Sequence, residues 1–272
     1  MQTRENDRRF GEDIATLYQD LLVPMIFTPY AVDLASRLAR LPVASVLELA
    51  AGTGVVTREL ASRLAPDVQL VATDLNEAML AVARKQGTSR PVRWRQADAM
   101  ALPFDDASFD AVACQFGAMF FPDRAHAFAE ARRVLRPGGT LWFNVWDGIQ
   151  TNDFAWVIQQ AVAGLFPDDP PRFLERLPHG YVPASAIARD LAQAGFAGEP
   201  LIETVAARSQ AITSAMAAIA YCQGTPLRNE IVARDPARLG EATEAATAAM
   251  TARFGAGPVT GRVQALVVRI DR

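Results

Sequence analysis

The stretch "VLELAAGTGVVTREL", residues 46 to 60, joins an apolar run to two glycines and then to a helical pattern. This order is typical of the turn between the first strand and the first helix of an α/β fold. Gly52 and Gly54 fall at the turn, where glycine lets the backbone bend tightly and approach a ligand. One acidic residue, Glu48, lies inside the apolar run. A buried carboxylate is costly unless something positive meets it, so the sequence raises the question of its partner.

Downstream of this turn, short apolar segments alternate with helical segments of about ten residues. The pattern predicts strands at 43–49, 68–73, 92–96, 109–115 and 140–146, and helices at 55–64, 77–85 and 124–135. Such alternation implies right-handed βαβ units and a parallel sheet covered on both faces.

Helical additions flank and interrupt this core. Residues 13–40 predict two helices broken near Pro24 and Pro29; further helices are expected at 152–166, 184–194 and 211–254, with strands at 199–206 and 262–270. We expect one domain over residues 1–272. Its cofactor-binding core covers about 43–147 with 184–206 and 261–272, and its cap elements cover about 1–40, 148–183 and 208–258. Such additions usually form a lid or a substrate wall, the plainer alternative being structural padding.

Composition narrows the class of protein. Half of the residues are hydrophobic and the net charge is −3, which argues against nucleic acid as a partner. The two cysteines, Cys114 and Cys222, lie far apart, and the acidic pair Asp105-Asp106 has no third ligand at metal spacing, so we expect no disulfide framework and no metal. The start is too charged for a signal peptide, and no apolar run approaches the ~20 residues of a membrane span. A cytoplasmic protein is expected.

A second acid, Asp74, ends the second expected strand, 20 residues after Gly54. An acid at this place can accept both hydrogens of a ribose diol, and Asn76 is available to cap the next helix in its stead. A dinucleotide fingerprint would need glycine or alanine where Thr57 stands, and it gives no role to Glu48. A ligand with an ammonium group near the glycine loop gives Glu48 a role. S-adenosylmethionine is such a ligand, with an amino acid end, a ribose and an adenine.

Five segments, in the right order and spacing over residues 43 to about 200, resemble class I S-adenosylmethionine-dependent methyltransferases. They are "VLELAAGTG" (46–54), "VATDLNEAMLAVA" (71–83), "ADAMALPFDDASFDAVACQFGAMFF" (97–121), "VLRPGGTLWFNVW" (134–146) and "LAQAGF" (191–196). Alanines stand at 50 and 51 where the commonest form of the first motif has Gly-Cys. The subgroup most resembled includes the ubiquinone and menaquinone C-methyltransferases. The resemblance implies a Rossmann-like α/β fold with a seven-stranded, mostly parallel sheet whose last strand is antiparallel.

The resemblance also implies roles for single residues. Glu48 would face the methionine ammonium directly or through water, and Asp74 would hold the ribose hydroxyls. Asp98 would accept from the adenine amino group while Ala99 donates to the ring. The other residues expected at S-adenosylmethionine, or at its product S-adenosylhomocysteine, are Ala50, Ala51, Gly52, Gly54, Leu75, Met79, Gln115 and Phe116.

Methyl transfer from a sulfonium needs alignment and exclusion of water more than it needs a catalytic triad. A base is required only where the acceptor must lose a proton. His179 and Tyr18 are the candidates for that role, with Tyr30 comparable to Tyr18 at the cofactor mouth; a surface or packing role is expected for His126. Aromatic side chains that could wall an apolar acceptor pocket are Phe27, Phe120 and Trp146.

The sequence therefore favours a methyltransferase acting on oxygen or carbon of a small, apolar or aromatic acceptor. Three alternatives stay open: an NAD(P)-dependent oxidoreductase, a non-catalytic S-adenosylmethionine-binding protein, and an aminopropyl transferase, which should carry more acids after the fourth strand. Neither the acceptor nor the choice between monomer and homodimer follows from the sequence.

Overall fold

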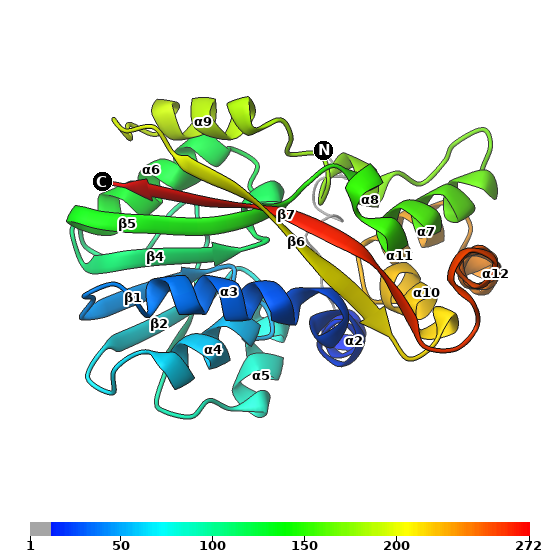
Figure 1. Cartoon of the computed structure of the whole chain (residues 1–272), viewed down its shortest axis with the longest axis horizontal. Coiled ribbons are helices and arrows are strands. Elements are labelled where there is room, and N and C mark those ends of the chain that lie inside the picture. The colour runs from blue at the N-terminus through cyan, green and yellow to red at the C-terminus, as the bar shows by residue number, and fades with distance from the viewer. Residues whose placement is uncertain (1–11) are drawn as a thin grey trace. The chain divides into compact units, whose positions relative to one another are not determined.

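The computed structural model describes residues 12–272, with only the backbone of Glu12 and Asp13. One seven-stranded sheet orders its strands β3-β2-β1-β4-β5-β7-β6 (Figure 1). Neighbours from β3 to β5 run parallel, and β7 runs antiparallel to β5. The predicted fold class is confirmed. The strands are β1 (Ser45–Leu49), β2 (Gln69–Asp74), β3 (Arg93–Gln96), β4 (Phe109–Gln115), β5 (Leu135–Trp146), β6 (Leu201–Ala211) and β7 (Val259–Asp271).

The helices follow the predicted alternation in the first half of the chain. There the chain forms α2 (Glu12–Leu17), the π-helical η1 (Tyr18–Phe27), α3 (Thr28–Leu38), α4 (Val55–Arg63), α5 (Glu77–Gln86) and α6 (Arg124–Val134). The second half contributes α7 (Asp153–Gly164), α8 (Phe173–Arg176), α9 (Ala184–Gln193), α10 (Ser214–Gln223), α11 (Leu227–Arg234) and α12 (Leu239–Phe254). Short 3₁₀ turns lie at Ala118–Phe120, Ile149–Thr151 and Pro236–Arg238.

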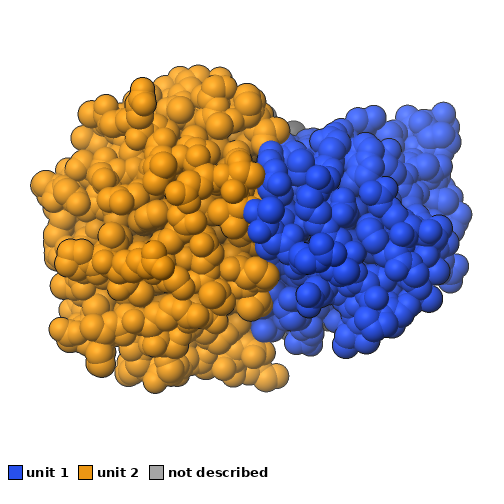
Figure 2. All heavy atoms as spheres, in the orientation of Figure 1, with its two compact units in different colours: residues 1–27, 147–180, 206–264 blue, residues 28–146, 181–205, 265–272 orange. Residues whose placement is uncertain are grey.

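The chain divides into two compact units, coloured in Figure 2. Unit 1 comprises residues 1–27, 147–180 and 206–264, and unit 2 comprises residues 28–146, 181–205 and 265–272. Residues 28–40 thus belong with the parallel strands, although the sequence grouped them with the cap. The predicted division into one core and its cap elements stays a prediction.

The expected break of the N-terminal helices near Pro24 and Pro29 is wrong. The segment is helical from Glu12 to Leu38, with Pro24 inside η1 and Pro29 as the second residue of α3. Pro29 is tolerated because a residue in the first turn of a helix needs no intrahelical acceptor for its N–H. Pro24 is tolerated because a π-helix does not use the i→i−4 hydrogen bonds that proline would remove.

The same helical run, Ile14–Leu38, is long and apolar enough to cross a membrane by length and composition. In its most apolar window, 56% of the residues are buried inside the structure, as in the core helix of a folded protein. The predicted absence of a membrane span stays a prediction.

The core of unit 2 explains why β1 reads as a continuous apolar run. All five residues of β1 are buried, since β2 and β4 flank it and helices cover it. The apolar cluster beside it is formed by α3, α4 and the strands: Ala31, Leu34, Ala35, Leu38, Val46, Val56, Leu60, Ala61, Leu64, Val68, Leu70, Ala111, Ala113, Trp142 and Val267. This packing fixes the carboxyl end of β1, from which the glycine loop leaves.

Candidate cofactor site

Three acids lie at the carboxyl ends of three neighbouring strands of unit 2. Glu48 is in β1, in register with Ala72 of β2, and Asp74 ends β2, in register with Gln96 of β3. Asp98 follows two residues after β3 ends. Carboxyl ends of adjacent parallel strands form one edge of a sheet, which is where α/β folds bind ligands. The structure therefore brings the three predicted acids to one edge.

Glu48 has a partner inside the chain. The Thr57 hydroxyl, in the first turn of α4, donates to its Oε2 at 2.5 Å, and the glutamate is only 1% exposed. Burial raises the pKa of Glu48 to about 8, against the opposing effects of the Thr57 hydrogen bond and the Arg58 charge. The sequence indicated a ligand as the partner of Glu48 and gave no sign of Thr57, which stands out there only as a departure from the dinucleotide pattern.

The loop after β1 is held in conformations that favour glycine. Ala50, Gly52 and Gly54 all have positive φ, at 51°, 56° and 82°. A Cβ on Gly54 would lie 2.9 Å from Cη2 of Trp94, a ring-to-backbone approach that no larger residue permits. A Cβ on Gly52 would meet nothing within 4 Å, so the loop is open on that side.

Asp74 ties this loop to β2. Its Oδ2 accepts from the backbone N–H of Gly52 and its Oδ1 from that of Asn76, both at 2.8 Å. Burial raises the pKa of Asp74, although these N–H groups act in the opposite direction. Asn76 occupies the predicted N-cap position of α5, but its side chain makes no cap hydrogen bond. The turn instead closes through the preceding aspartate, which accepts from the N–H two residues on.

The predicted adenine region combines an exposed apolar surface with an exposed acid. Leu75 is 40% exposed, and the Gln96 side chain fixes its carbonyl with a 2.8 Å hydrogen bond. Asp98 is exposed, with Oδ1 accepting from the N–H of Met100 at 2.9 Å. Ala99 is half-buried, whereas Met79 is buried.

The end of β4 is shaped by Asn144, a residue not predicted from the sequence. The N–H of Phe116 donates to the Asn144 side-chain oxygen at 3.0 Å and to its backbone oxygen at 3.1 Å. Asn144 also donates to the side chain of Gln115 at 3.4 Å. Phe116 adopts a φ of 51° there. A polar residue in the apolar run "LWFNVW" was the available signal.

An aromatic cluster packs beneath this turn. Phe116 stacks on Trp146 with ring centroids 3.6 Å apart, and Tyr30 meets both rings edge-on at 5.3 Å. All three are buried, and the Tyr30 hydroxyl donates to the Val205 carbonyl. Trp146, expected to wall an acceptor pocket, is thus 4% exposed and packed within unit 2. Phe120, in the 3₁₀ turn after β4, is half-buried.

Three other candidates belong to unit 1. Tyr18 and Phe27 stack on each other at 4.9 Å. His179 is buried, with Nδ1 placed 2.8 Å from the carbonyl oxygen of Asp147. Burial lowers the pKa of His179 to about 4, so the ring is neutral at pH 7. His126, in unit 2, is exposed and its Nε2 lies 2.9 Å from the Met100 carbonyl oxygen, as a surface role requires.

The loop and acids fit the nucleoside and amino acid parts of S-adenosylmethionine. Thr53, in the glycine loop, is 1% exposed, and its hydroxyl has no hydrogen-bond partner among the described residues. The neighbouring Gly52 is open on its Cβ side, and Leu75, which follows Asp74 at the end of β2, is exposed. A polar ligand with a flat ring would supply a partner for the hydroxyl, fill the open side of the loop and pack its ring on the apolar face of Leu75.

Residues 12–272 hold no cluster of three or more His, Cys, Asp or Glu side chains that could bind a metal ion.

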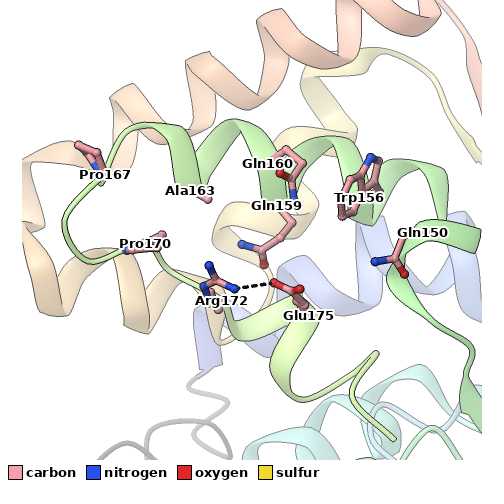
Figure 3. Close-up of a pocket in the computed structure, with 9 residues that line it drawn as sticks. All are labelled: Gln150, Trp156, Gln159, Gln160, Ala163, Pro167, Pro170, Arg172 and Glu175. Carbon is pink, nitrogen blue, oxygen red and sulfur yellow. Dashed lines mark hydrogen bonds and ion pairs between the residues drawn. The ribbon is translucent and has the colours of Figure 1, made fainter. Parts of the chain in front are cut away.

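Unit 1 has a cavity of its own, of about 370 Å³ (Figure 3). It lies beside α7, and its lining residues are Gln150, Trp156, Gln159, Gln160, Ala163, Pro167, Pro170, Arg172 and Glu175. The Gln159 amide donates to the Pro171 carbonyl at 2.5 Å. No residue that the sequence assigned to a site lines this cavity.

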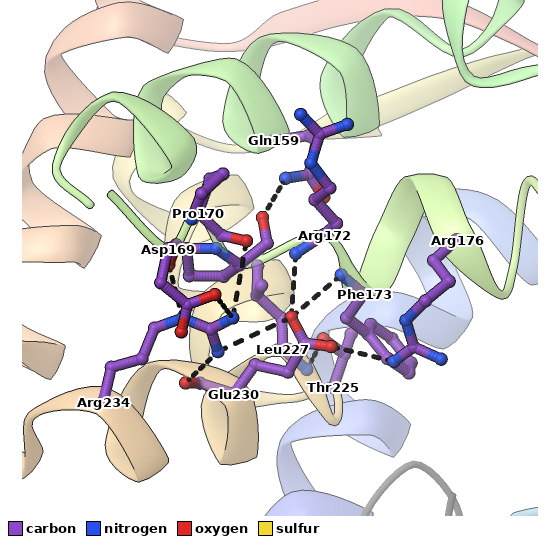
Figure 4. Close-up of polar contacts among 11 residues, drawn as sticks. Gln159, Asp169, Pro170, Arg172, Phe173, Arg176, Thr225, Leu227, Glu230 and Arg234 are labelled. Carbon is purple, nitrogen blue, oxygen red and sulfur yellow. Dashed lines mark hydrogen bonds and ion pairs between the residues drawn. The ribbon is translucent and has the colours of Figure 1, made fainter. Parts of the chain in front are cut away.

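The wall of that cavity is fixed by Glu230 of α11 (Figure 4). Its Oε2 accepts from the backbone N–H groups of Arg172 and Phe173 at 2.8 and 3.1 Å, and its Oε1 from Arg176 at 2.8 Å. Arg234 fastens the same segment by donating to the Asp169 carbonyl at 2.6 Å.

Known proteins are similar to this chain both in the sequence around residues 47–143 and in fold. Residues 47–143 match the family model described as "Methyltransferase domain". The ubiquinone/menaquinone biosynthesis C-methyltransferase of Hahella chejuensis is 43% identical over 102 residues, 36% of this chain and 41% of that protein. The demethylmenaquinone methyltransferase of Thermus thermophilus is 46% identical over 113 residues, 41% of this chain and 50% of that protein. The chain therefore matches half or less of these curated relatives.

Among solved structures, a SAM-dependent methyltransferase of Thermotoga maritima superposes with a TM-score of 0.54 at 16% identity, covering 98% of each chain. Identity this low shows a shared fold, and the shared fold extends over nearly the whole chain. The resemblance drawn from the five sequence segments is confirmed.

Proposed function

We propose that the whole chain transfers the methyl group of S-adenosylmethionine to a small acceptor molecule, because residues 47–143 match the family model of a methyltransferase domain. The acceptor is apolar or aromatic, and the methyl group goes to carbon or oxygen. Two relatives matched by this segment are named as a ubiquinone/menaquinone biosynthesis C-methyltransferase and a demethylmenaquinone methyltransferase, which supports a phenol- or quinol-like acceptor.

The observation that carries this proposal is the row of Glu48, Asp74 and Asp98 at one edge of the sheet beside an open glycine loop. An adenine, a ribose diol and an ammonium each present hydrogen-bond donors, and carboxylates are acceptors for all of them. The spacing of three strand ends matches the order of those groups along the ligand.

The bound cofactor supplies an activated methyl group on a sulfonium. The protein has to hold the ligand so that acceptor, methyl carbon and sulfur are in line, and to keep water away. Asp74 and Asp98 hold the nucleoside, Glu48 holds the amino acid end, and the loop from Ala50 to Gly54 packs along the ligand. Asn144 keeps the turn at Gln115 and Phe116 in place.

An acceptor phenol must lose a proton before or during transfer, and a base serves that step. His179 is neutral at pH 7 and so can accept a proton, although its lowered pKa makes it a weak base. His179 and Tyr18 stay candidates for the acceptor side of the reaction.

The two main alternatives give the site a different task. An NAD(P)-dependent oxidoreductase leaves Glu48 without a function, and a non-catalytic binding protein would keep the cofactor residues without an acceptor site. With a net charge of −3, we also propose that the protein acts on a small molecule in the cytoplasm rather than on nucleic acid, as a monomer or a homodimer.

Calorimetric titration with S-adenosylhomocysteine tests the proposal. We expect binding near micromolar affinity, weakened at least tenfold in Asp74→Asn, a loss above about 1.4 kcal/mol. Asp106→Asn is the matched control, because Asp106 is an exposed aspartate that pairs with Arg133 at 2.8 Å and is not among the expected cofactor residues. Binding of NAD(H) in place of S-adenosylhomocysteine, or binding indifferent to Asp74, would contradict the proposal. Transfer of labelled methyl to a panel of phenols and quinols then separates an enzyme from a binding protein.

A further inference from the structure

The carboxyl group of Glu48 lies in surroundings that disfavour its charge. It belongs to a strand buried along its whole length, with Ala72 of β2 on one side and Ala113 of β4 on the other. The residue itself is 1% exposed. An ionised carboxylate there loses its hydration, and only nearby donors or positive charges can replace it.

Four groups that titrate or donate hydrogen bonds act on Glu48 from the elements packed against it. From α4, Thr57 donates to Oε2 and Arg58 contributes a positive charge, while from β2 Asp74 contributes a like charge. From β4, the thiol of Cys114 is neutral, since burial raises its pKa to about 12. Arg58 also donates to the Thr53 carbonyl at 2.7 Å.

We infer that Glu48 meets the ammonium group of S-adenosylmethionine as a protonated acid, which ionises on binding and releases its proton to solvent. We infer further that Thr57 is the positioning residue that holds the resulting carboxylate. Both inferences rest on the proposed function. The O–H bond of the acid breaks, its electron pair stays on the carboxylate, and the ligand's ammonium adds a positive charge to that of Arg58.

The geometry supports a role for Thr57 beyond packing. Its hydroxyl is fully buried in the first turn of α4, directly after the glycine loop, and the bond to Glu48 joins the end of β1 to the start of that helix. A hydroxyl that donates to a carboxylate favours the ionised form. Thr57 therefore lowers the free energy of the state that the ligand needs.

The first test counts protons. S-adenosylhomocysteine is titrated at pH 7 in several buffers of different ionisation enthalpy, and the slope of the observed enthalpy gives the protons released. With a pKa of about 8, Glu48 is roughly nine-tenths protonated at pH 7, so we expect more than about half a proton per ligand. 5′-Methylthioadenosine, which has the nucleoside and thioether without the ammonium, should bind and release none.

Variants then assign the proton. Glu48→Gln should abolish proton release, weaken S-adenosylhomocysteine at least tenfold and leave 5′-methylthioadenosine within about twofold. Thr57→Val should weaken S-adenosylhomocysteine severalfold at pH 7 and move its pH dependence to higher pH, and Thr57→Ser should restore both. Thr140→Val is the matched control: it removes a buried hydroxyl of β5, which donates to the Ile270 carbonyl at 3.4 Å.

The outcomes separate the two proposals. If neither nucleoside ligand binds the native protein, the proposed function fails, and the inference falls with it. If both ligands bind but S-adenosylhomocysteine releases less than about a fifth of a proton, the inference alone is overturned. Unaltered pH dependence in Thr57→Val, beside an intact Thr140→Val control, removes the positioning role.

Discussion

At the scale of single residues, the buried carboxyl of Glu48 makes the stability of the ligand-free protein depend on pH. Its pKa is about 8 in the folded chain and near 4.5 when exposed. The folded state therefore binds a proton that the unfolded state has already lost, and stability falls as pH rises from 4.5 through 8. His179 acts in the other direction, since its lowered pKa destabilises the folded state as pH falls from 6.5 to about 4.

Between pH 6.5 and 8 the destabilisation due to His179 changes by less than about 0.5 kcal/mol, so this window reports mainly on Glu48. We expect the free energy of unfolding of the native protein to fall across it by about 1 kcal/mol or more. In Glu48→Gln that fall should largely disappear. Urea unfolding at four pH values measures both proteins, and an equal fall in the two would show that another group is responsible.

At the scale of elements, the turn from β1 into α4 depends on the close approach of Trp94 to the glycine loop. Gly54→Ala meets two obstacles, a φ of +82° and a Cβ only 2.9 Å from the indole ring. We expect a loss of about 2 kcal/mol or more in stability and at least tenfold weaker binding of S-adenosylhomocysteine.

Gly87→Ala is the control for that substitution. Gly87 has a φ of +73° at the end of α5, but a Cβ there meets nothing within 4 Å. It should cost about 1 kcal/mol through backbone conformation alone and leave ligand binding unchanged. Equal effects of the two substitutions on binding would mean that Trp94 does not shape the loop.

In unit 1, α8 is a four-residue helix that depends on Glu230 for its first N–H groups. Glu230→Ala removes the carboxylate that accepts from these N–H groups and from Arg176, and should destabilise the protein by about 2 kcal/mol. Glu175→Ala should change stability by less than about 0.5 kcal/mol, since its bond to Arg172 spans 3.5 Å between exposed side chains. Thermal unfolding, with proteolysis mapped over residues 167–176, compares the two.

The sequence predicted those elements whose signals are local. The apolar strands, the turn glycines and the three acids were all predictable, because burial on both faces and turn geometry restrict residue type at each position. Thr57 and Asn144 were not, since a hydrogen bond to Glu48 or Phe116 depends on two segments meeting. Helix α8 was missed for the same reason, because its N–H groups are satisfied by α11.

At the scale of the whole molecule, the predicted cofactor residues all fall in unit 2, whereas His179, Tyr18 and Phe27 fall in unit 1. Hydrogen–deuterium exchange with S-adenosylhomocysteine should therefore slow at residues 46–54, 72–79, 96–101 and 113–118. Residues 156–176, around the unit 1 cavity, should exchange as before, because no cofactor residue lines that cavity. Protection centred on residues 156–176 instead would mean that the nucleoside binds at the unit 1 cavity, and the predicted cofactor site would be wrong.

The order of strands in the sheet has a consequence for synthesis on the ribosome. β7 lies between β5 and β6, yet it follows both in the chain, and Arg272 still pairs with Gly138 and Gly139 through backbone hydrogen bonds. A nascent chain of 250 residues therefore exposes the edge of β5 and has no neighbour for β6. The emerging polypeptide must keep the strand edges that β7 will pair with from other chains until β7 has left the ribosome.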